Sequence, residues 1–198
     1  GVKNAFVEHK YSVPADQQDS GAALKNQASL DITQADDIER KGDGQLIAVI
    51  DTGIDTDHEA FSGDLDDDSV VLSQDGAAKA RSNMKRGGQN GAYISEKIPF
   101  VYDYADNDAE VNPGISGLEH GTHVAGIAAA NGGEIRGTAP NAQLAVMKVA
   151  SDADGGIYDS ALLAAMDDIP SLGASSVNIS IGADAGFSDE GAGTYTDA

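Results

Sequence analysis

The chain has 198 residues, of which 40% are apolar, and this is sufficient for one domain with a hydrophobic core. Its formal net charge of −21 argues against nucleic acid or an anionic membrane as a partner, because both would repel it. The chain contains no cysteine, which excludes disulfides, thiol chemistry and cysteine-ligated zinc, and no apolar run is long enough to insert into a membrane.

The N-terminal residues differ in composition from the rest of the chain. Residues 1–13 contain a strand-like piece that Pro14 ends, and residues 15–29 are small and polar, as in a linker. We therefore predict an N-terminal extension over residues 1–29, followed by the main domain over residues 30–198.

The main domain alternates predicted strands with predicted helices. Helices are expected over residues 31–40, 120–131 and 160–172, the last with Leu162, Leu163, Met166 and Ile169 directed inward. Strands are expected over residues 46–50, 97–104, 143–149 and 175–181. The first of these is apolar on both faces, as a central strand of a covered parallel sheet must be. The pattern predicts a layered α/β domain built from right-handed βαβ units.

A surface insertion of about residues 62–96 separates the first two strands of the main domain. It is polar and weakly periodic, and we expect one short strand in it, at residues 70–72. Its acidic run consists of Asp64, Asp66, Asp67 and Asp68. This run lacks the spacing of an EF-hand loop, so a solvated acidic surface is the main interpretation. A structural calcium ion is the alternative.

Two polar side chains stand at the ends of apolar elements. Asp51 follows the strand at 46–50, and His120 opens the helix at 120–131. An unpaired charge buried at a strand end costs several kcal/mol, so Asp51 needs a partner, and His120 is the strongest candidate. A carboxylate beside an imidazole orients the ring and stabilises the imidazolium that forms when the ring accepts a proton. The sequence therefore predicts a pair in which His120 acts as a general base.

Other residues near this pair allow further interpretations. Gly121 and Gly126 are expected to permit close backbone contact of the helix, and His123 is expected to be a core histidine with a satisfied hydrogen bond. A zinc site formed by Asp51, His120 and His123 is an alternative. However, the i, i+3 spacing of the two histidines differs from the H-E-x-x-H pattern of zinc proteases.

The segments around the two residues resemble the aspartate and histidine signatures of the subtilisin-like serine proteases. The matching segments are Val49-Ile50-Asp51-Thr52-Gly53-Ile54-Asp55 and His120-Gly121-Thr122-His123-Val124-Ala125-Gly126. Further matches at residues 137–149 and 177–182 extend the resemblance from about Ile32 to Gly186. Residues 97–108, KIPFVYDYADND, are similar to the cell-envelope proteinases of Gram-positive bacteria, the lactocepin-like group that includes complement-cleaving peptidases.

This resemblance implies a three-layer α/β/α subtilisin-like fold with a mostly parallel sheet, incomplete in this chain. It implies that Asp51 orients His120 and that His120 deprotonates a serine, which attacks a peptide bond of a protein substrate without any cofactor. The substrate-binding residues that it implies are Asp154, Gly155, Gly156, Ser180, Ile181 and Gly182. These would flank an extended peptide and bind its backbone by strand addition.

The resemblance also implies that part of the enzyme is missing from these residues. In the family, the serine and the oxyanion-hole asparagine come later, and residues 1–198 contain no G-T-S-M-A-like segment. We therefore expect the chain to be inactive alone and to need the remaining C-terminal part of the same protease. Residues 1–13 are similar to the tail of a subtilase propeptide, and the expected location is extracellular, secreted or associated with the cell wall. A non-catalytic peptide-binding module and a metallohydrolase are the alternatives.

Overall fold

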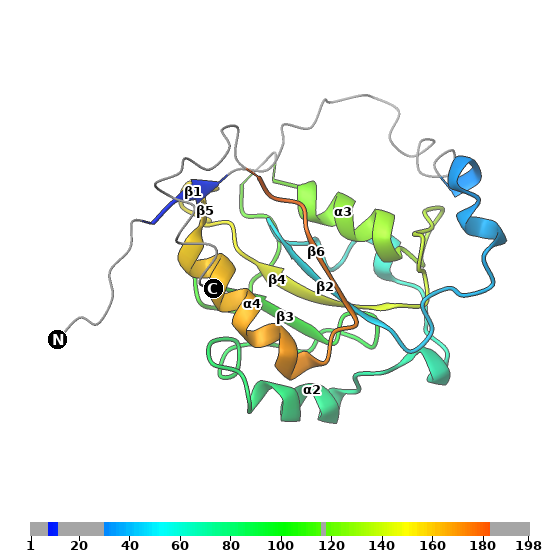
Figure 1. Cartoon of the computed structure of the whole chain (residues 1–198), viewed down its shortest axis with the longest axis horizontal. Coiled ribbons are helices and arrows are strands. Elements are labelled where there is room, and N and C mark those ends of the chain that lie inside the picture. The colour runs from blue at the N-terminus through cyan, green and yellow to red at the C-terminus, as the bar shows by residue number, and fades with distance from the viewer. Residues whose placement is uncertain (1–7, 12–29, 116–117, 183–198) are drawn as a thin grey trace, which may run out of the picture.

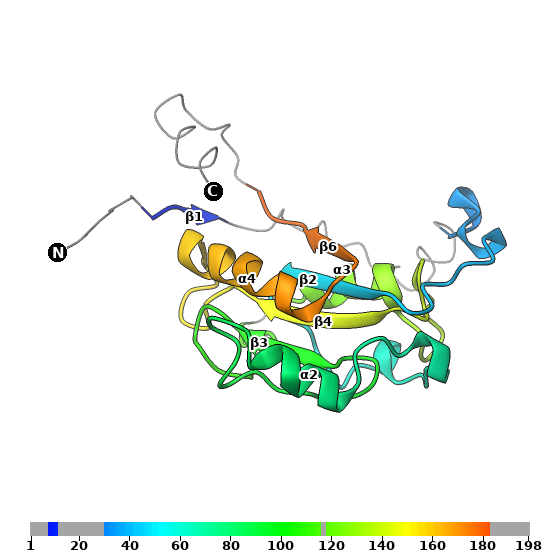
Figure 2. The ribbon, with the colours of Figure 1, turned by 60° about the horizontal axis from the view of Figure 1, so that its bottom comes forward.

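A parallel sheet lies at the centre of the molecule. The structure is a computed structural model and describes residues 8–11, 30–115 and 118–182. Within these residues the sheet consists of β2 (Leu46–Asp51), β3 (Phe100–Asp103), β4 (Gln143–Lys148) and β6 (Ser176–Ile179). The strands are parallel and follow the order β3-β4-β2-β6, with β6 at one edge (Figure 2). The sheet therefore places the apolar segment before Asp51 in a central position, as predicted.

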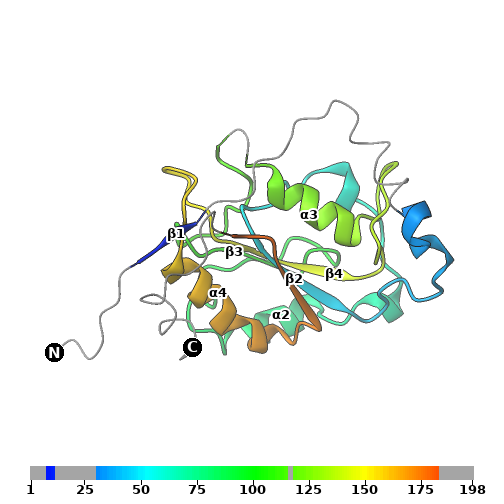
Figure 3. The same ribbon diagram turned by 45° about the horizontal axis from the view of Figure 1, so that its top comes forward.

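Helices cover both faces of this sheet (Figures 1 and 3). One face packs against α3 (His120–Ala129), and the other packs against α2 (Gln74–Arg81) and α4 (Asp159–Leu172). Side chains alternate between the two layers along a strand, so that Ala48 and Ile50 of β2 pack toward α2 and α4, whereas Val49 packs toward α3. The predicted α/β fold with a parallel sheet is confirmed.

Short elements complete the described part of the chain. The 3-10 helices are η1 (Ala35–Asp37), η2 (Glu59–Phe61) and η3 (Asp67–Ser69). A small antiparallel sheet pairs β1 (Lys10–Tyr11) with β5 (Ile157–Tyr158). None of the helices in the described residues is both long enough and apolar enough to cross a membrane.

The predicted helix over residues 31–40 is interrupted. Residues 30–33 are helical, but Gln34 adopts a left-handed conformation with φ of 55°, and η1 then leads into an extended Ile38. Ile32 and Ile38 are 83% and 53% exposed. Leu30 and Ala35 are buried, but the two isoleucines bury little surface and add little of the packing that stabilises most short helices in proteins.

The surface insertion contains a helix and not the predicted strand at 70–72. The backbone N–H groups of Val71 and Leu72 donate to Oε1 of Gln143, at 2.9 and 2.7 Å. They are therefore not available for a strand ladder. Ser73 then accepts a backbone N–H bond as the N-cap of α2, and this cap starts the helix.

Helix α4 faces the core with smaller side chains than expected. Its buried residues are Asp159, Ala161, Ala165, Asp168 and Leu172, and Leu162 and Ile169 are partly buried beside them. Leu163 and Met166, which were expected to point inward, are 39% and 46% exposed. The two alanines let the helix lie close to the sheet, and the larger side chains lie to either side.

Strand β6 is more exposed than its apolar sequence predicted. Val177 and Ile179 are 44% and 39% exposed. The strand pairs with β2 on one side, and no described residue forms a strand on its other side. The apolar pattern therefore lies at an edge of the described sheet.

A completely buried carboxylate on α4 joins this helix to the turn after α2. Asp168 accepts hydrogen bonds from the backbone N–H groups of residues 85–87, at 2.7 to 3.2 Å, and from the Tyr104 hydroxyl at 3.1 Å. No local pattern in the sequence predicts this role, because Asp168 follows another aspartate in an amphipathic helix.

Replacing Asp168 with asparagine should lower the free energy of unfolding by about 2–4 kcal/mol, because the new amide nitrogen cannot accept the bonds that one carboxylate oxygen accepts. Urea denaturation followed by circular dichroism measures the change. Asp167→Asn is the matched control, since the Asp167 side chain is 59% exposed and pairs with Lys85 at the surface. That control should change stability by less than about 1 kcal/mol. Equal losses in the two variants would contradict the role of Asp168.

A buried lysine links the segment before β3 to the turn before β4. Lys97 is 2% exposed, and its ammonium group donates to the carbonyl oxygens of Pro140 and Ala142 at 2.8 and 2.6 Å. Burial lowers the pKa of Lys97 to about 7.

The stability of the chain should rise with pH because of Lys97. Its folded pKa of about 7 lies below the ordinary value of 10.5, so between these values the unfolded state binds more protons. The free energy of unfolding should increase from pH 7 to pH 9 by at most about 1.4 kcal/mol per pH unit. Urea denaturation at both pH values should show a smaller increase for Lys97→Met. An equal change in the free energy of unfolding with pH in the two proteins would show that the pKa of Lys97 is not lowered.

Candidate active site

Asp51 and His120 meet at the carboxyl end of the parallel sheet. Asp51 is the last residue of β2, and His120 is the first residue of α3. His120 Nδ1 lies 2.8 Å from Asp51 Oδ1, and the two side chains are 10% and 1% exposed. Because the carboxylate accepts this bond, Nδ1 carries the proton and Nε2 is the ring nitrogen that can exchange protons with another group. The structure thus brings together the two residues predicted to act as a pair.

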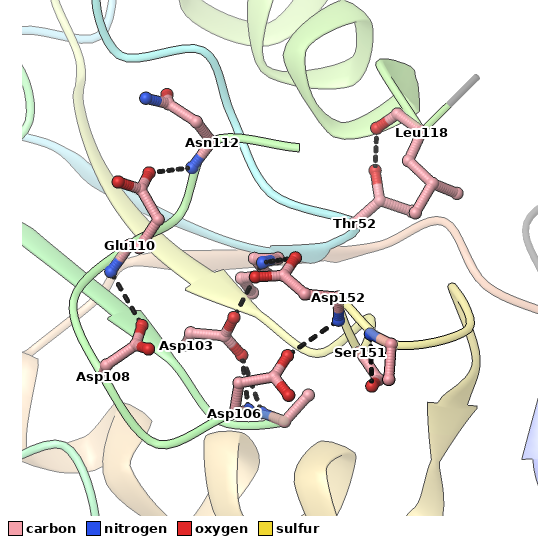
Figure 4. Close-up of polar contacts among 12 residues, drawn as sticks. Thr52, Asp103, Asp106, Asp108, Glu110, Asn112, Leu118, Ser151 and Asp152 are labelled. Atoms are coloured by element: carbon pink, nitrogen blue, oxygen red, sulfur yellow. Dashed lines mark hydrogen bonds and ion pairs between the residues drawn. The ribbon is translucent and has the colours of Figure 1, made fainter. Parts of the chain in front are cut away.

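Thr52 holds the pair in place through three hydrogen bonds. Its backbone N–H donates to Asp51 Oδ1 at 2.7 Å. Its hydroxyl donates to the carbonyl oxygen of Leu118 at 2.7 Å (Figure 4). The same hydroxyl accepts from the backbone N–H of Gly121 at 3.0 Å. These bonds join the end of β2 to the first turn of α3, so that backbone groups set the position of Asp51 relative to His120.

Two glycines let the end of β2 and the start of α3 touch. Gly53 has φ of 108°, and a Cβ at Gly121 would lie 2.2 Å from the carbonyl oxygen of Gly53. The close contact predicted for Gly121 is therefore confirmed. The prediction for Gly126 is wrong, because a Cβ there would meet no atom within 4 Å. Between these two positions the helix turns by about 140°, so Gly126 lies on another side of it.

The predicted second histidine of this helix lies apart from the pair. His123 is exposed and not in the core, because its position on α3 points away from the buried face. The group of three potential metal ligands found among the described residues consists of Asp103, Asp106 and Asp152. Neither the residues of the zinc alternative nor the acidic run at 64–68 forms such a group, so the structure lends these two interpretations no support.

A buried lysine and its two carboxylate partners lie beside the pair. Lys148 ends β4 in register with Asp51, and its Nζ lies 2.8 Å from Asp103 Oδ2, with both side chains 0% exposed. The ammonium group also contacts Asp152. Burial lowers the pKa of Lys148, but the two carboxylates outweigh this effect and raise its pKa above the usual value. Burial likewise raises the pKa of Asp103, and Lys148 opposes this shift. No local pattern predicts this cluster, because Lys148 ends an apolar strand and Asp103 ends a different strand.

The first predicted peptide-binding segment lies against the N-terminal strand β1. Asp154 Oδ2 accepts from Lys10 Nζ at 2.7 Å and from the Tyr158 hydroxyl at 2.8 Å. The hydrogen bond from Lys10 is the main cause that lowers the pKa of Asp154 to about 2. A Cβ at Gly156 would lie 2.3 Å from Cε of Lys10, and Gly155 has φ of 65°. The small residues of this segment therefore let another chain segment lie close to its backbone.

The second predicted segment, residues 180–182, follows the end of β6. Because β6 pairs in parallel with β2, this segment continues from the same end of the sheet as Asp51. Ser180 Oγ donates to Asn178 Oδ1 at 2.8 Å. A Cβ at Gly182 would meet no atom within 4 Å, so no described residue packs against it.

Comparison with known proteins accords with this geometry. The sequence profile of the subtilase family, Peptidase_S8, matches residues 42–198, and this range contains both Asp51 and His120. The chain belongs to the subtilase family.

Two groups of proteins are similar to this subtilase chain. The PI-type proteinase of Lactococcus lactis subsp. cremoris and the PII-type proteinase of Lacticaseibacillus paracasei are each 36% identical over 154 residues, which cover 74% of the chain and 8% of the relative. The C5a peptidase of Streptococcus pyogenes is 33% identical over 152 residues, which cover 72% of the chain and 12% of the relative. The chain thus spans a small part of the length of these relatives, and its predicted likeness to this group of subtilases is confirmed.

Gly121→Ala should destabilise the subtilase chain by about 1–3 kcal/mol, because the new methyl group would force α3 away from Gly53. It should also weaken the downfield proton NMR signal of His120 Nδ1–H, which reports the hydrogen bond to Asp51. Gly126→Ala is the matched control in the same helix. It should raise stability by up to about 1 kcal/mol through helix propensity and leave the signal unchanged. An unchanged signal in Gly121→Ala would show that this close contact does not position the pair.

Proposed function

We propose that this chain supplies the aspartate and the histidine of an Asp-His-Ser triad in a serine endopeptidase. The observation that carries the proposal is the 2.8 Å hydrogen bond between His120 Nδ1 and Asp51 Oδ1 at the end of a parallel sheet. Membership of the subtilase family and the similarity to proteins named proteinase and peptidase support it.

In the proposed reaction Asp51 keeps the proton of His120 on Nδ1. His120 Nε2 then accepts the proton of the attacking serine, and Asp51 stabilises the imidazolium that forms. The imidazolium returns this proton to the leaving amine of the cleaved peptide. We assign the serine and the oxyanion-hole asparagine to the remaining C-terminal part of the same protease, because residues 1–198 contain no G-T-S-M-A-like segment. The reaction needs no cofactor, and a structural calcium ion stays a prediction.

We further propose that residues 154–156 and 180–182 flank an extended substrate peptide. The support is the antiparallel pairing of β1 with β5, which directly follows Gly156, because a substrate peptide could pair with this part of the chain in the same way. In this proposal β1 belongs to an N-terminal extension over residues 1–29, of which residues 1–13 resemble the tail of a propeptide. The substrates are proteins or peptides, and the enzyme is extracellular, either secreted or associated with the cell wall.

A non-catalytic peptide-binding module is the second candidate function. The same strand pairing of β1 and β5 supports it, since binding by strand addition needs no nucleophile. The reading frame of the parent protein separates the two candidates. A serine motif downstream of these residues supports the peptidase, and its absence supports the binding module.

The parent protease should hydrolyse a chromogenic peptide, and Asp51→Asn should lower its kcat/KM by about 10⁴-fold, because His120 would lose its correct tautomer. Asp57→Asn, at an exposed aspartate in the same segment, is the matched control and should leave kcat/KM unchanged. Equal activity of Asp51→Asn and the wild type would refute the role of Asp51.

Residues 1–198 alone should give no turnover in the same assay, because removing the nucleophile of such an enzyme costs about 10⁶ in rate. Turnover by the isolated chain that a serine-directed fluorophosphonate blocks would show that these residues contain their own nucleophile.

A further inference from the structure

Lys148 contacts several parts of the candidate site at once. The ends of β3, β4 and β2 are in register, so that Asp103, Lys148 and Asp51 form a row across the sheet. The stem of Lys148 packs at Gly53, where its Cδ lies 3.0 Å from the position of an added Cβ. Its ammonium group lies between Asp103 and Asp152. One buried side chain therefore joins three strand ends to the loop after β4.

Hydrogen bonds from backbone N–H groups also hold the carboxylates around Lys148 in place. Asp106 Oδ2 accepts from the backbone N–H of Asp152 at 2.8 Å. Asp103 Oδ1 accepts from the backbone N–H groups of Ala105 and Asp106 at 2.8 and 3.0 Å. Figure 4 shows the three aspartates close together at the ends of the strands. These carboxylates repel one another, and the ammonium group of Lys148 offsets this repulsion for Asp103 and Asp152, the two that it contacts.

The loop after β4 is held together by its own hydrogen bonds. The backbone N–H of Ser151 donates to the carbonyl oxygen of Gly156 at 3.0 Å, and that of Gly155 donates to the carbonyl oxygen of Ser151 at 2.8 Å. Residues 151–156 therefore form one small unit. The contact of Lys148 with Asp152 anchors this unit to the sheet.

The aliphatic part of the Lys148 side chain packs beside Gly53, close to the pair of Asp51 and His120. Gly53, which it touches, contacts the backbone of Gly121, the residue after His120. We propose that Lys148 is a positioning residue that holds residues 149–156 at a fixed place relative to Asp51 and His120. The inference rests on the proposed function, because it assigns these residues to peptide binding.

The test uses Lys148→Met combined with Asp103→Asn in the chain of residues 1–198. Removing both charges avoids leaving a buried carboxylate without its cation, and the asparagine keeps the oxygen that accepts from Ala105 and Asp106. In ¹H–¹⁵N NMR spectra the amide signals of Gly155 and Gly156 should shift or broaden. The downfield His120 Nδ1–H signal should persist, because it reports that the pair and the sheet remain folded.

Lys97→Met is the matched control, because Lys97 is also a buried lysine but donates to carbonyl oxygens elsewhere. It should lower stability without moving the signals of Gly155 and Gly156. Unmoved glycine signals in the folded double variant would overturn the inference. An equal shift of the Gly155 and Gly156 signals in Lys97→Met would also overturn it, because the loss of any buried lysine would then have the same effect.

Kinetics of the parent protease give the second readout. The double variant should raise KM for an extended peptide at least about fivefold, because residues 154–156, which are proposed to bind the peptide, would move. The value of kcat should change less than about twofold, because Asp51 and His120 would stay in place. A fall in kcat at constant KM would overturn the inference that Lys148 positions residues 149–156. If the wild-type parent has no peptidase activity, the proposed function fails, whereas the NMR comparison still decides whether Lys148 positions the loop.

Discussion

Charges at the carboxyl end of the sheet lie out of reach of water. The side chains of Asp103 and Lys148 are completely buried, and that of Asp51 is 1% exposed. A buried ion without a partner costs several kcal/mol, so each of these groups must be compensated by a neighbour. Lys148 compensates Asp103 and Asp152, and His120 meets Asp51. This requirement links the ends of β2, β3 and β4 to the start of α3 and to the loop that carries Asp152.

Because Lys148 pairs with Asp103 and Asp152, Asp51 is left to pair with His120. The ammonium group of Lys148 is engaged by two other carboxylates, so Asp51 has the imidazole and the N–H of Thr52 as its hydrogen-bond donors. Its second oxygen, Oδ2, is buried and has no hydrogen-bond partner among the described residues. Among the described residues, the imidazole of His120 is therefore the side chain that donates to Asp51.

Much of the fold could be predicted from the sequence, because its signals are local. The apolar runs gave the strands, and the segments around Asp51 and His120 indicated the pair, whose contact the structure shows. The failures have a common physical cause in tertiary contacts. The backbone of residues 71 and 72 is held by the side chain of Gln143, which no local pattern reveals.

Buried polar groups were the other limit of the sequence analysis. Asp168 and Lys148 are both completely buried. A charged residue in an amphipathic helix, or at the end of an apolar strand, is normally read as solvent-exposed. Asp168 accepts from residues 85–87 and Tyr104, and Lys148 pairs with Asp103, so partners that are distant in the sequence compensate both charges, and only the three-dimensional arrangement reveals this.

The order of the strands has a consequence for the synthesis of the chain. β2 carries Asp51 and lies between β4 and β6, and the ribosome makes both of these later. Non-local pairing must first overcome the entropy of closing long loops, so both edges of β2 stay open until the later segments emerge. We expect this apolar strand to need protection from association during that interval. The region around Asp51 would then be among the last to reach its native packing.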